Sequence, residues 1–426
     1  MMLLTYDEAL EFIHGTEKFG SVLGLQKISK LLEILGNPQN KLKFIHVAGT
    51  KGKGSVCVML SNILTEQGYN TGLYISPYVE DFCERIQCNG AKIPHESVSA
   101  LTLLVKDACE KMASRGFPHP TEFEIVTAVG FLYFAQKKCD YVVLEVGLGG
   151  RFDATNVIPS PLLAVITLIG IDHTRELGDT VEKIAYEKCG IIKEGSAVVS
   201  YPQENAKALS VIKKQAAEKN TPLYLTNMDN VKILENSVTP RFIYNGLEIS
   251  LGLMGIHQIK NAATVLNCVF TLRGLGVKIS DAAILSGLKN TRFAGRMEFI
   301  RDNLLIDAAH NEVSIRAFCE AVKAIVPDRR LIIVTGIFAD KDYMQCAEIL
   351  KGTADTLIAT EPSSVRALPA ADYARFLNTE YIFTSPEQAV SFALSIAEKN
   401  DLVCVCGSLH LIAEVREIFF DGRERS

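Results

Sequence analysis

The segment His46-Val47-Ala48-Gly49-Thr50-Lys51-Gly52-Lys53-Gly54-Ser55 decides how this chain folds. It continues the apolar run Phe44–Val47 and leads into a helical pattern over Ser55–Glu66, so we expect a glycine-rich turn between a strand and a helix. Glycines let successive backbone N–H groups of such a turn face one anion at the positive end of the helix. Lys53 would reach the terminal phosphates of a nucleotide, and Ser55 would bind magnesium. The spacing is shorter than the usual G-x-x-x-x-G-K-[ST], and a flexible basic turn is the alternative.

Strand-length apolar runs alternate with longer segments of helical period on both sides of this turn. This alternation predicts an α/β fold with a mainly parallel, doubly wound sheet. The expected strands are Phe44–Val47, Gly72–Ile75, Tyr141–Val146, Leu163–Leu168, Leu304–Asp307, Leu331–Thr335, Thr356–Ala359 and Leu402–Cys406. Between Ala197 and Ile249, short β-like pieces such as Pro222–Leu225 and Arg241–Tyr244 predict a small antiparallel addition.

The length of the chain indicates two domains. Its 426 residues, 48% of them apolar, exceed what one hydrophobic core usually organises. A new strand–helix series starts after Gly295, so we expect one domain over residues 1–295 and a second, Rossmann-like α/β domain over residues 296–426.

Bulk composition excludes several classes of partner. The net charge is −5 and the basic residues are dispersed, so no nucleic-acid partner is expected. Acidic residues follow the first few positions before any apolar run becomes long enough for a signal peptide or membrane span, which predicts a cytoplasmic protein without a membrane partner. The eleven cysteines lie mostly in apolar runs, so we expect buried, reduced thiols.

Two further positions are candidates for magnesium ligands, because they follow strands at the edge where the glycine turn should lie. Glu145 ends a predicted strand directly before Gly147-Leu148-Gly149-Gly150-Arg151, and His173 follows the run 163–171. Hard oxygen ligands suit magnesium, which favours Glu145. A solvated strand cap at Glu145 and a hydrogen-bonded structural histidine at His173 are the alternatives.

Several spaced strings resemble the folylpolyglutamate synthases, the folate branch of the Mur ligase superfamily. The resemblance is carried by 46–55, Ser76-Pro77-Tyr78, Glu84-Arg85-Ile86, the string 145–156 (EVGLGGRFDATN), Glu187-Lys188-Cys189-Gly190-Ile191, His257-Gln258 with Asn261-Ala262, Gly295-Arg296, 307–311 (DAAHN), Asp340-Lys341-Asp342 and Gly407-Ser408-Leu409. It extends to the end of the chain and implies an N-terminal P-loop ATPase domain of the Mur ligase kind.

The resemblance also implies roles for individual residues. ATP would be held by Gly49, Thr50, Lys51, Gly52, Lys53, Gly54, Ser55, Asn261, Arg296 and Asp307. Two magnesium ions would be served by Ser55, Ser76, Glu145, His173 and Lys188, the last as a carbamate, because a bare ammonium would repel the metal. Catalysis would depend on Lys53, Lys188, His173 and Arg296. Without the resemblance, the competing interpretation of Lys188 is a surface ion pair. The competing interpretation of Arg296 is an interdomain salt bridge.

The resemblance places the two organic substrates as well. Glutamate would be bound by Asp307, His310 and Ser408. The folate or dihydropteroate would be bound by Leu23, Gly24, Leu25, Gln26, Thr121, Glu122, Phe123, Glu124, Phe152, Asp153 and Ala154. Departures from the commoner family pattern at Gln26-Lys27 and Glu122 lie beside the expected pterin pocket and leave the substrate preference open, while Ala294, Ala308 and His410 are further departures.

The expected activity is an ATP-dependent amide ligase that adds L-glutamate to dihydropteroate, to the γ-carboxylate of folate polyglutamates, or to both, through an acyl phosphate. Only small-molecule partners and a monomer are expected. A folylpolyglutamate synthase alone is one alternative. A Mur-type cell-wall ligase is another, although it should carry an additional N-terminal domain for which residues 1–43 are too few. A non-catalytic nucleotide switch is the alternative from a different class, and it gives His310 and Ser408 no role.

Overall fold

An eight-stranded sheet organises the first half of the chain, in the order β4-β3-β2-β5-β1-β6-β7-β8. The computed structural model describes residues 4–16, 24–327 and 329–420. The strands are β1 (Phe44–Ala48), β2 (Thr71–Tyr74), β3 (Ile86–Cys88), β4 (Ala91–Lys92), β5 (Tyr141–Glu145), β6 (Leu163–Ile166), β7 (Ala197–Ser200) and β8 (Leu223–Leu225). Six neighbouring strands of this sheet run parallel: β2, β5, β1, β6, β7 and β8. The strands β3 and β4 form an antiparallel edge beside β2.

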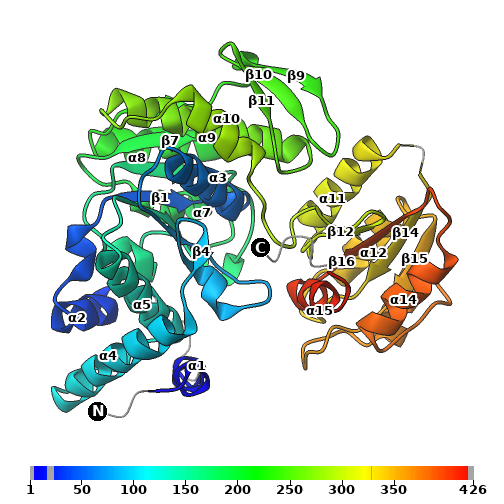
Figure 1. The fold of residues 1–426 in the computed structure, drawn as a ribbon, viewed down its shortest axis with the longest axis horizontal. Helices are drawn as coiled ribbons and strands as arrows, with labels where there is room; N and C mark the ends of the chain where they lie inside the picture. Colours follow the sequence, from blue (N-terminus) through cyan, green and yellow to red (C-terminus); the bar gives the residue numbers. More distant parts are fainter. Residues whose placement is uncertain (1–3, 17–23, 328, 421–426) are drawn as a thin grey trace.

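Helices cover both faces of this sheet (Figure 1). One face is covered by α3 (Lys53–Glu66), α9 (Ile256–Gly274) and α10 (Asp281–Lys289). On the other side lie α1 (Tyr6–His14), α2 (Gln26–Ile34), α4 (His95–Ser114), α5 (Glu122–Gln136), α7 (Val181–Lys188) and α8 (Ala206–Glu218). Alternate side chains of β1 serve both layers: Ile45 and Val47 pack in the α3 layer and Phe44 in the α5 layer. Covering on both faces explains why the strands read as continuous apolar runs.

The antiparallel addition is smaller than the sequence predicted. A three-stranded sheet contains β9 (Val231–Glu235), β10 (Arg241–Tyr244) and β11 (Leu247–Ser250). The piece at Pro222–Leu225 was wrongly assigned to it, because β8 pairs in parallel with β7 and extends the large sheet. The segment before β8 forms the helix α8. A three-residue strand carries too short a pattern to reveal its partner, so only the fold decides its sheet.

The second α/β unit is a five-stranded sheet, in the order β12-β13-β16-β14-β15, drawn from yellow to red in Figure 1. Its strands are β12 (Glu298–Arg301), β13 (Leu304–Ile306), β14 (Leu331–Thr335), β15 (Thr356–Ala359) and β16 (Leu402–Cys406), all parallel except β12. Helices α11 (Glu312–Ile325), α12 (Tyr343–Lys351) and α13 (Ala370–Leu377) cover one face, and α14 (Pro386–Ile396) and α15 (Leu409–Phe419) cover the other. The predicted two-unit α/β fold is confirmed.

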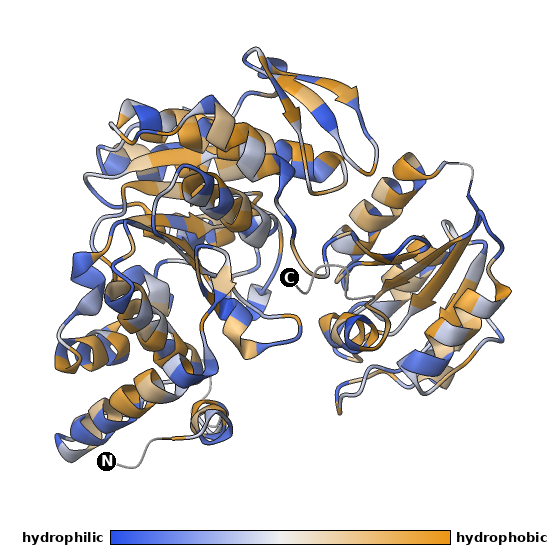
Figure 2. Ribbon diagram, viewed as in Figure 1, coloured by the Kyte–Doolittle hydropathy of each residue, from blue (hydrophilic) through white to orange (hydrophobic). Residues whose placement is uncertain are grey.

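Short helices complete the connections: η2 (Pro38–Lys41), η3 (Phe82–Arg85), η4 (Ala154–Val157), α6 (Thr174–Leu177), η5 (Cys189–Ile191) and η6 (Met228–Asn230). Figure 2 shows apolar residues concentrated in the strands of both sheets. All eleven cysteines are free and buried, as predicted. Within the described ranges, no helix combines the length and apolar character needed to cross a membrane.

Candidate active site

The glycine turn leaves β1 and enters α3 at the carboxyl edge of the large sheet. The N–H groups of Thr50 and Lys51 donate to Leu168 O, at 2.8 and 3.2 Å, so the first part of the turn is fixed to the loop after β6. Gly52 is left-handed, with φ of 85°, and a Cβ there would lie 2.6 Å from Asn261 Oδ1. The first N–H groups of α3 follow directly and have no partner within the helix. The turn is therefore shaped to present amides to an anion.

Two lysine side chains donate hydrogen bonds to the same backbone carbonyl of this turn. Lys53 Nζ donates to Gly49 O at 3.1 Å, and Lys188 Nζ donates to the same oxygen at 2.9 Å. Lys188 is only 3% exposed. Burial, with a further contribution from the Lys53 charge, lowers the pKa of Lys188 to about 7. A large share of this amine is therefore neutral near pH 7, and the neutral form is the one that can react with carbon dioxide.

Glu145 ends β5 beside the turn. Its Oε2 accepts the N–H of Ser76 at 3.0 Å and lies 3.6 Å from where a Cβ on Gly54 would be. Burial raises the pKa of Glu145, although the nearby Lys53 and Arg296 charges and the Ser76 N–H work in the opposite direction. The Glu145 carboxylate, the backbone N–H of Ser76 and the start of α3 are thus within one small region.

Ser55 is held from α9. Gln258 Nε2 donates to Ser55 Oγ at 3.1 Å, and Gln258 Oε1 accepts from Asn261 Nδ2 at 2.9 Å. Gln258 was not predicted as a site residue. The signal was present in the sequence, because positions 258 and 261 share one face of a helix and Asn261 was already a candidate.

His173 lies on the rim of this group. Its side chain is 55% exposed, and its N–H donates to Asp172 Oδ1 at 3.0 Å. Asp172 Oδ2 lies 3.8 Å from Lys51 Nζ, which connects the rim to the turn. Among the described residues, no hydrogen bond or ion pair joins His173 to Ser55 or Glu145. Asp172, which was not predicted as a site residue, provides the connection.

The second unit contributes Arg296, Asp307 and His310. Asp307 accepts the N–H groups of Met297 and Ala309, both at 2.8 Å, and burial raises its pKa while the charge of Arg296 opposes that shift. Arg296 lies 5.8 Å from the ring centroid of Phe293, and that ring would be 2.8 Å from a Cβ on Gly54. Phe293, also not predicted, therefore lies beside both Gly54 of the turn and Arg296.

His310 is an uncharged imidazole near neutral pH. Its Nδ1 lies 2.8 Å from Ala308 O, which can only accept, so Nδ1 carries the proton and Nε2 can accept a hydrogen bond. Burial lowers its pKa to about 4, and the charges of Lys51, Arg296 and Lys341 add to this effect. His310 therefore lies within electrostatic reach of the glycine turn. Ser408 caps the start of α15, and its Oγ accepts the Leu411 N–H at 3.0 Å.

The predicted folate-binding segments gather around the start of α5. Thr121 and Glu124 form a capping box there, Lys27 Nζ lies 3.5 Å from Glu124, and His14 Nδ1 lies 3.2 Å from Glu122. Gly24, Leu25 and Gln26 lie at the start of α2, whereas Leu23 falls outside the described residues. These segments therefore form one neighbourhood, in which both acidic residues of α5 are paired with bases.

The glycine-rich string after β5 adjoins this neighbourhood. The Phe123 ring would lie 2.6 Å from a Cβ on Gly147. Asp153 is buried and accepts the N–H groups of Leu148 and Thr155, at 2.8 and 3.0 Å. Ala154 is buried beside it, and Phe152 is 46% exposed. The string thus runs from Glu145 to the predicted folate segments, which connects the two parts of the site.

Two family models match the chain. The Mur ligase middle domain matches residues 47–269, and the Mur ligase glutamate ligase domain matches residues 295–409. The chain is 36% identical to the dihydrofolate synthase/folylpolyglutamate synthase of Bacillus subtilis (strain 168), over 98% of this chain and 99% of that protein. It is 32% identical to the protein of the same name from Escherichia coli (strain K12), over 93% and 91%.

Solved structures of folylpolyglutamate synthases are also similar to this chain. Folylpolyglutamate synthase from Thermotoga maritima is similar with a TM-score of 0.87 and 34% identity, covering 98% of this chain and 97% of that one. E. coli FolC in complex with DHPP and ADP is similar with a TM-score of 0.87 and 29% identity, covering 99% of each chain.

Proposed function

This chain belongs to the folylpolyglutamate and dihydrofolate synthases of the Mur ligase superfamily, and from that membership we propose that its single site performs both ligations. It is an ATP-dependent ligase that joins glutamate to folates. In the proposed first reaction, dihydropteroate receives glutamate to give dihydrofolate. In the second, the γ-carboxylate of a reduced folate receives further glutamates. The names of the B. subtilis and E. coli relatives include both activities, which supports this proposal.

The observation that carries the proposal is the position of Lys53 and Glu145 at the glycine turn, with Arg296 of the second unit beside the Phe293 ring that lies against Gly54. In the proposed chemistry, the γ-phosphoryl group of ATP passes to the substrate carboxylate and the amine of glutamate then displaces phosphate from the acyl phosphate. Lys53 and Arg296 offset the negative charge that spreads over the transferring group. The remaining proposed ATP contacts are Gly49, Thr50, Lys51, Gly52, Gly54, Ser55, Asn261 and Asp307.

Two magnesium ions are proposed beside the turn, where the Glu145 carboxylate lies against the start of α3. Ser55 and Ser76 hydroxyls, the Glu145 carboxylate and the His173 imidazole would hold them, and magnesium would neutralise phosphate charge when bound. Lys188 fits as a carbamate. Burial lowers the pKa of its amine to about 7, and the neighbouring Lys53 ammonium, which donates to the same carbonyl, would favour an anionic group at Lys188 over a second ammonium.

Glutamate binding is proposed at Asp307, His310 and Ser408. The neutral His310 can accept a hydrogen bond at Nε2 from the amino group of glutamate, and Lys51 and Arg296 bring positive charge to the same region, which suits the glutamate carboxylates. The folate is proposed to bind near the start of α5 and the string 147–154. Closure of the two units over the site would exclude water, which would otherwise hydrolyse the acyl phosphate. The proposed domains remain 1–295 and 296–426, in a cytoplasmic monomer.

The test is substrate-dependent phosphate release by the purified protein. We expect release from ATP with glutamate plus dihydropteroate, and also with glutamate plus tetrahydrofolate, while omission of glutamate abolishes it. Mass spectrometry of the products should find one added glutamate in the first case and an extended tail in the second. Activity with tetrahydrofolate plus glutamate but not with dihydropteroate plus glutamate would restrict the protein to folylpolyglutamate synthesis. Release that is indifferent to glutamate would overturn the ligase site as a whole.

A further inference from the structure

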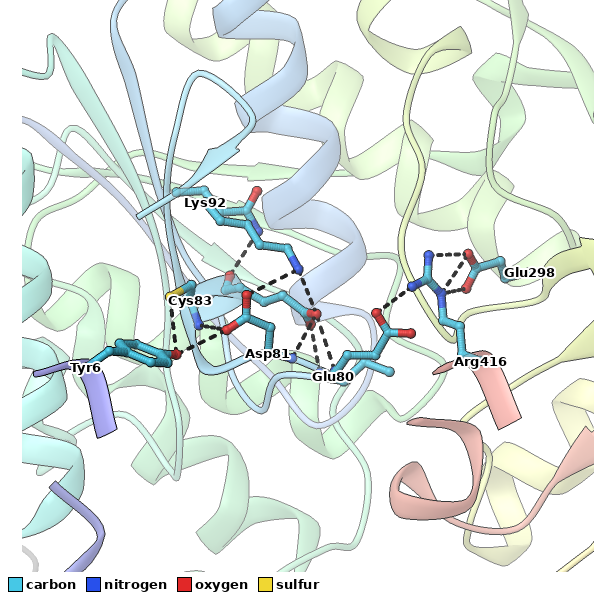
Figure 3. A network of polar contacts seen from close by, with 10 residues as sticks. Tyr6, Glu80, Asp81, Cys83, Lys92, Glu298 and Arg416 are labelled. Carbon is cyan, nitrogen blue, oxygen red and sulfur yellow. Dashed lines mark hydrogen bonds and ion pairs between the residues drawn. The ribbon is translucent and has the colours of Figure 1, made fainter. Parts of the chain in front are cut away.

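One guanidinium in the last turn of α15 bridges the two α/β units. Arg416 Nη1 lies 2.7 Å from Glu80 Oε2 of the first unit, and its Nε and Nη2 donate to Glu298 of the second unit at 3.0 to 3.1 Å (Figure 3). The Arg416 side chain is 17% exposed. A planar guanidinium that binds one carboxylate through two nitrogens and a second carboxylate through the third fixes direction as well as distance.

On the second unit, this bridge continues to Arg296. Glu298 Oε2 accepts the N–H of Gly295 at 2.7 Å, and Gly295 O accepts the N–H of Ala308 at 2.8 Å. Gly295 is left-handed, with φ of 64°, and directly precedes Arg296. Arg416, Glu298 and Arg296 also line the same cavity, of about 1050 Å³. The guanidinium of Arg416 therefore holds the turn from which Arg296 reaches the site.

On the first unit, the bridge continues to the loop that carries Ser76. Glu84 gathers this loop by accepting the N–H groups of Val79, Glu80 and Asp81, at 2.8, 3.3 and 3.2 Å. The far side of the loop is anchored as well, because Lys92 pairs with both Asp81 and Glu84, and Tyr6 OH donates to Asp81 at 3.3 Å (Figure 3). The loop is thus compact, and Glu80 is four residues from Ser76, whose N–H holds Glu145.

We infer that Arg416 is a positioning residue that sets Arg296 against the glycine turn when the two units close. Without it, the Glu80 and Glu298 carboxylates would face each other across the interface with no cation between them, and their repulsion would favour separation. The inference rests on the proposed function for its effect on ligation, although the arrangement of the two units is a property of the chain alone.

Arg416→Met tests this inference. ATP affinity is expected to change by less than about 5-fold, because the turn and Lys53, which make most of the proposed nucleotide contacts, belong to the first unit, while kcat for ligation falls by up to about 100-fold through misplacement of Arg296. Arg416→Lys keeps the positive charge but loses the planar guanidinium, so its kcat should lie between the values of wild type and Arg416→Met. Adding Glu80→Gln to Arg416→Met should restore part of kcat because it removes one of the opposed carboxylates.

Arg316→Met is the matched control, because Arg316 forms an exposed pair with Glu312 at 3.0 Å within α11. It should leave kcat and ATP affinity unchanged. Small-angle scattering provides a readout without turnover: Arg416→Met should have a larger radius of gyration than wild type with the same melting temperature for the first unit. If wild type is active and Arg416→Met has the same kcat and radius of gyration as wild type, the inference about Arg416 is wrong while the proposed function stands. A wild type without ligase activity would instead overturn the proposed function.

Discussion

The two halves of the site differ in how they are held. Around the glycine turn, hydrogen bonds connect residues that are far apart in the chain but belong to one unit, such as Lys188 with Gly49 and Gln258 with Ser55. On the second unit, Asp307 and His310 bond mainly to neighbouring backbone and reach the turn through charge. The first half is therefore preformed by its own fold, whereas the second half acts only when the units are correctly apposed. Nucleotide binding and ligation should accordingly be separable.

Lys53→Ala should give the largest effect and act on the preformed half. Loss of a preorganised cation at the phosphates should reduce kcat by about 10²- to 10³-fold. The melting temperature should stay near that of wild type, because the Lys53 side chain makes a loop contact with Gly49 rather than core packing. Steady-state phosphate release and thermal unfolding measure the two quantities. Undiminished turnover would mean that the phosphates bind elsewhere.

Lys188→Met should reduce ligation by about 10- to 100-fold, as the loss of a group that supports metal ligands commonly does. Wild-type activity should rise with bicarbonate and the variant should not respond. An intact mass that never includes the added carboxyl group, even at high bicarbonate, would remove the carbamate from the proposal.

Lys188 also gives a pH test of the fold. Its pKa of about 7 when folded lies below the ordinary 10.5, so between these values the unfolded chain binds more protons. In the unmodified protein, without bicarbonate, the stability of wild type relative to Lys188→Met should rise with pH through this window, by at most about 1.4 kcal/mol per pH unit. Urea unfolding at several pH values measures it. A difference that stays flat or falls with rising pH would show that the amine is not desolvated.

His310→Ala should act on the second half and leave the first intact. Loss of a hydrogen bond to a charged substrate should raise KM for glutamate by about 10-fold, while ATP affinity stays unchanged. The pH profile of the wild type should lack a transition from His310 between pH 5 and 8, because its pKa is lowered to about 4. Equal losses of ATP and glutamate affinity would contradict the separation of the halves.

Glu122→Gln should have the smallest effect. It weakens the pairing of Glu122 with His14 at 3.2 Å near the start of α5, and such partly exposed pairs contribute about 0–1 kcal/mol. KM for the folate substrate should change by less than about 5-fold, with glutamate and ATP parameters constant. A selective change for dihydropteroate over tetrahydrofolate would place this position at the pterin. A change in ATP affinity would argue against that location.

The sequence by itself determined the α/β class, the glycine turn, most strand positions and the candidate residues that end strands, such as Glu145. Local patterns are sufficient there, because a buried parallel strand reads as an apolar run and its carboxyl end is adjacent in the chain. Three features depend on the tertiary structure alone. Lys188 donates to the carbonyl oxygen of Gly49, β8 extends the large sheet, and Arg416 bridges Glu80 and Glu298. These contacts join positions separated by many residues, and their existence depends on burial and packing that no local pattern encodes.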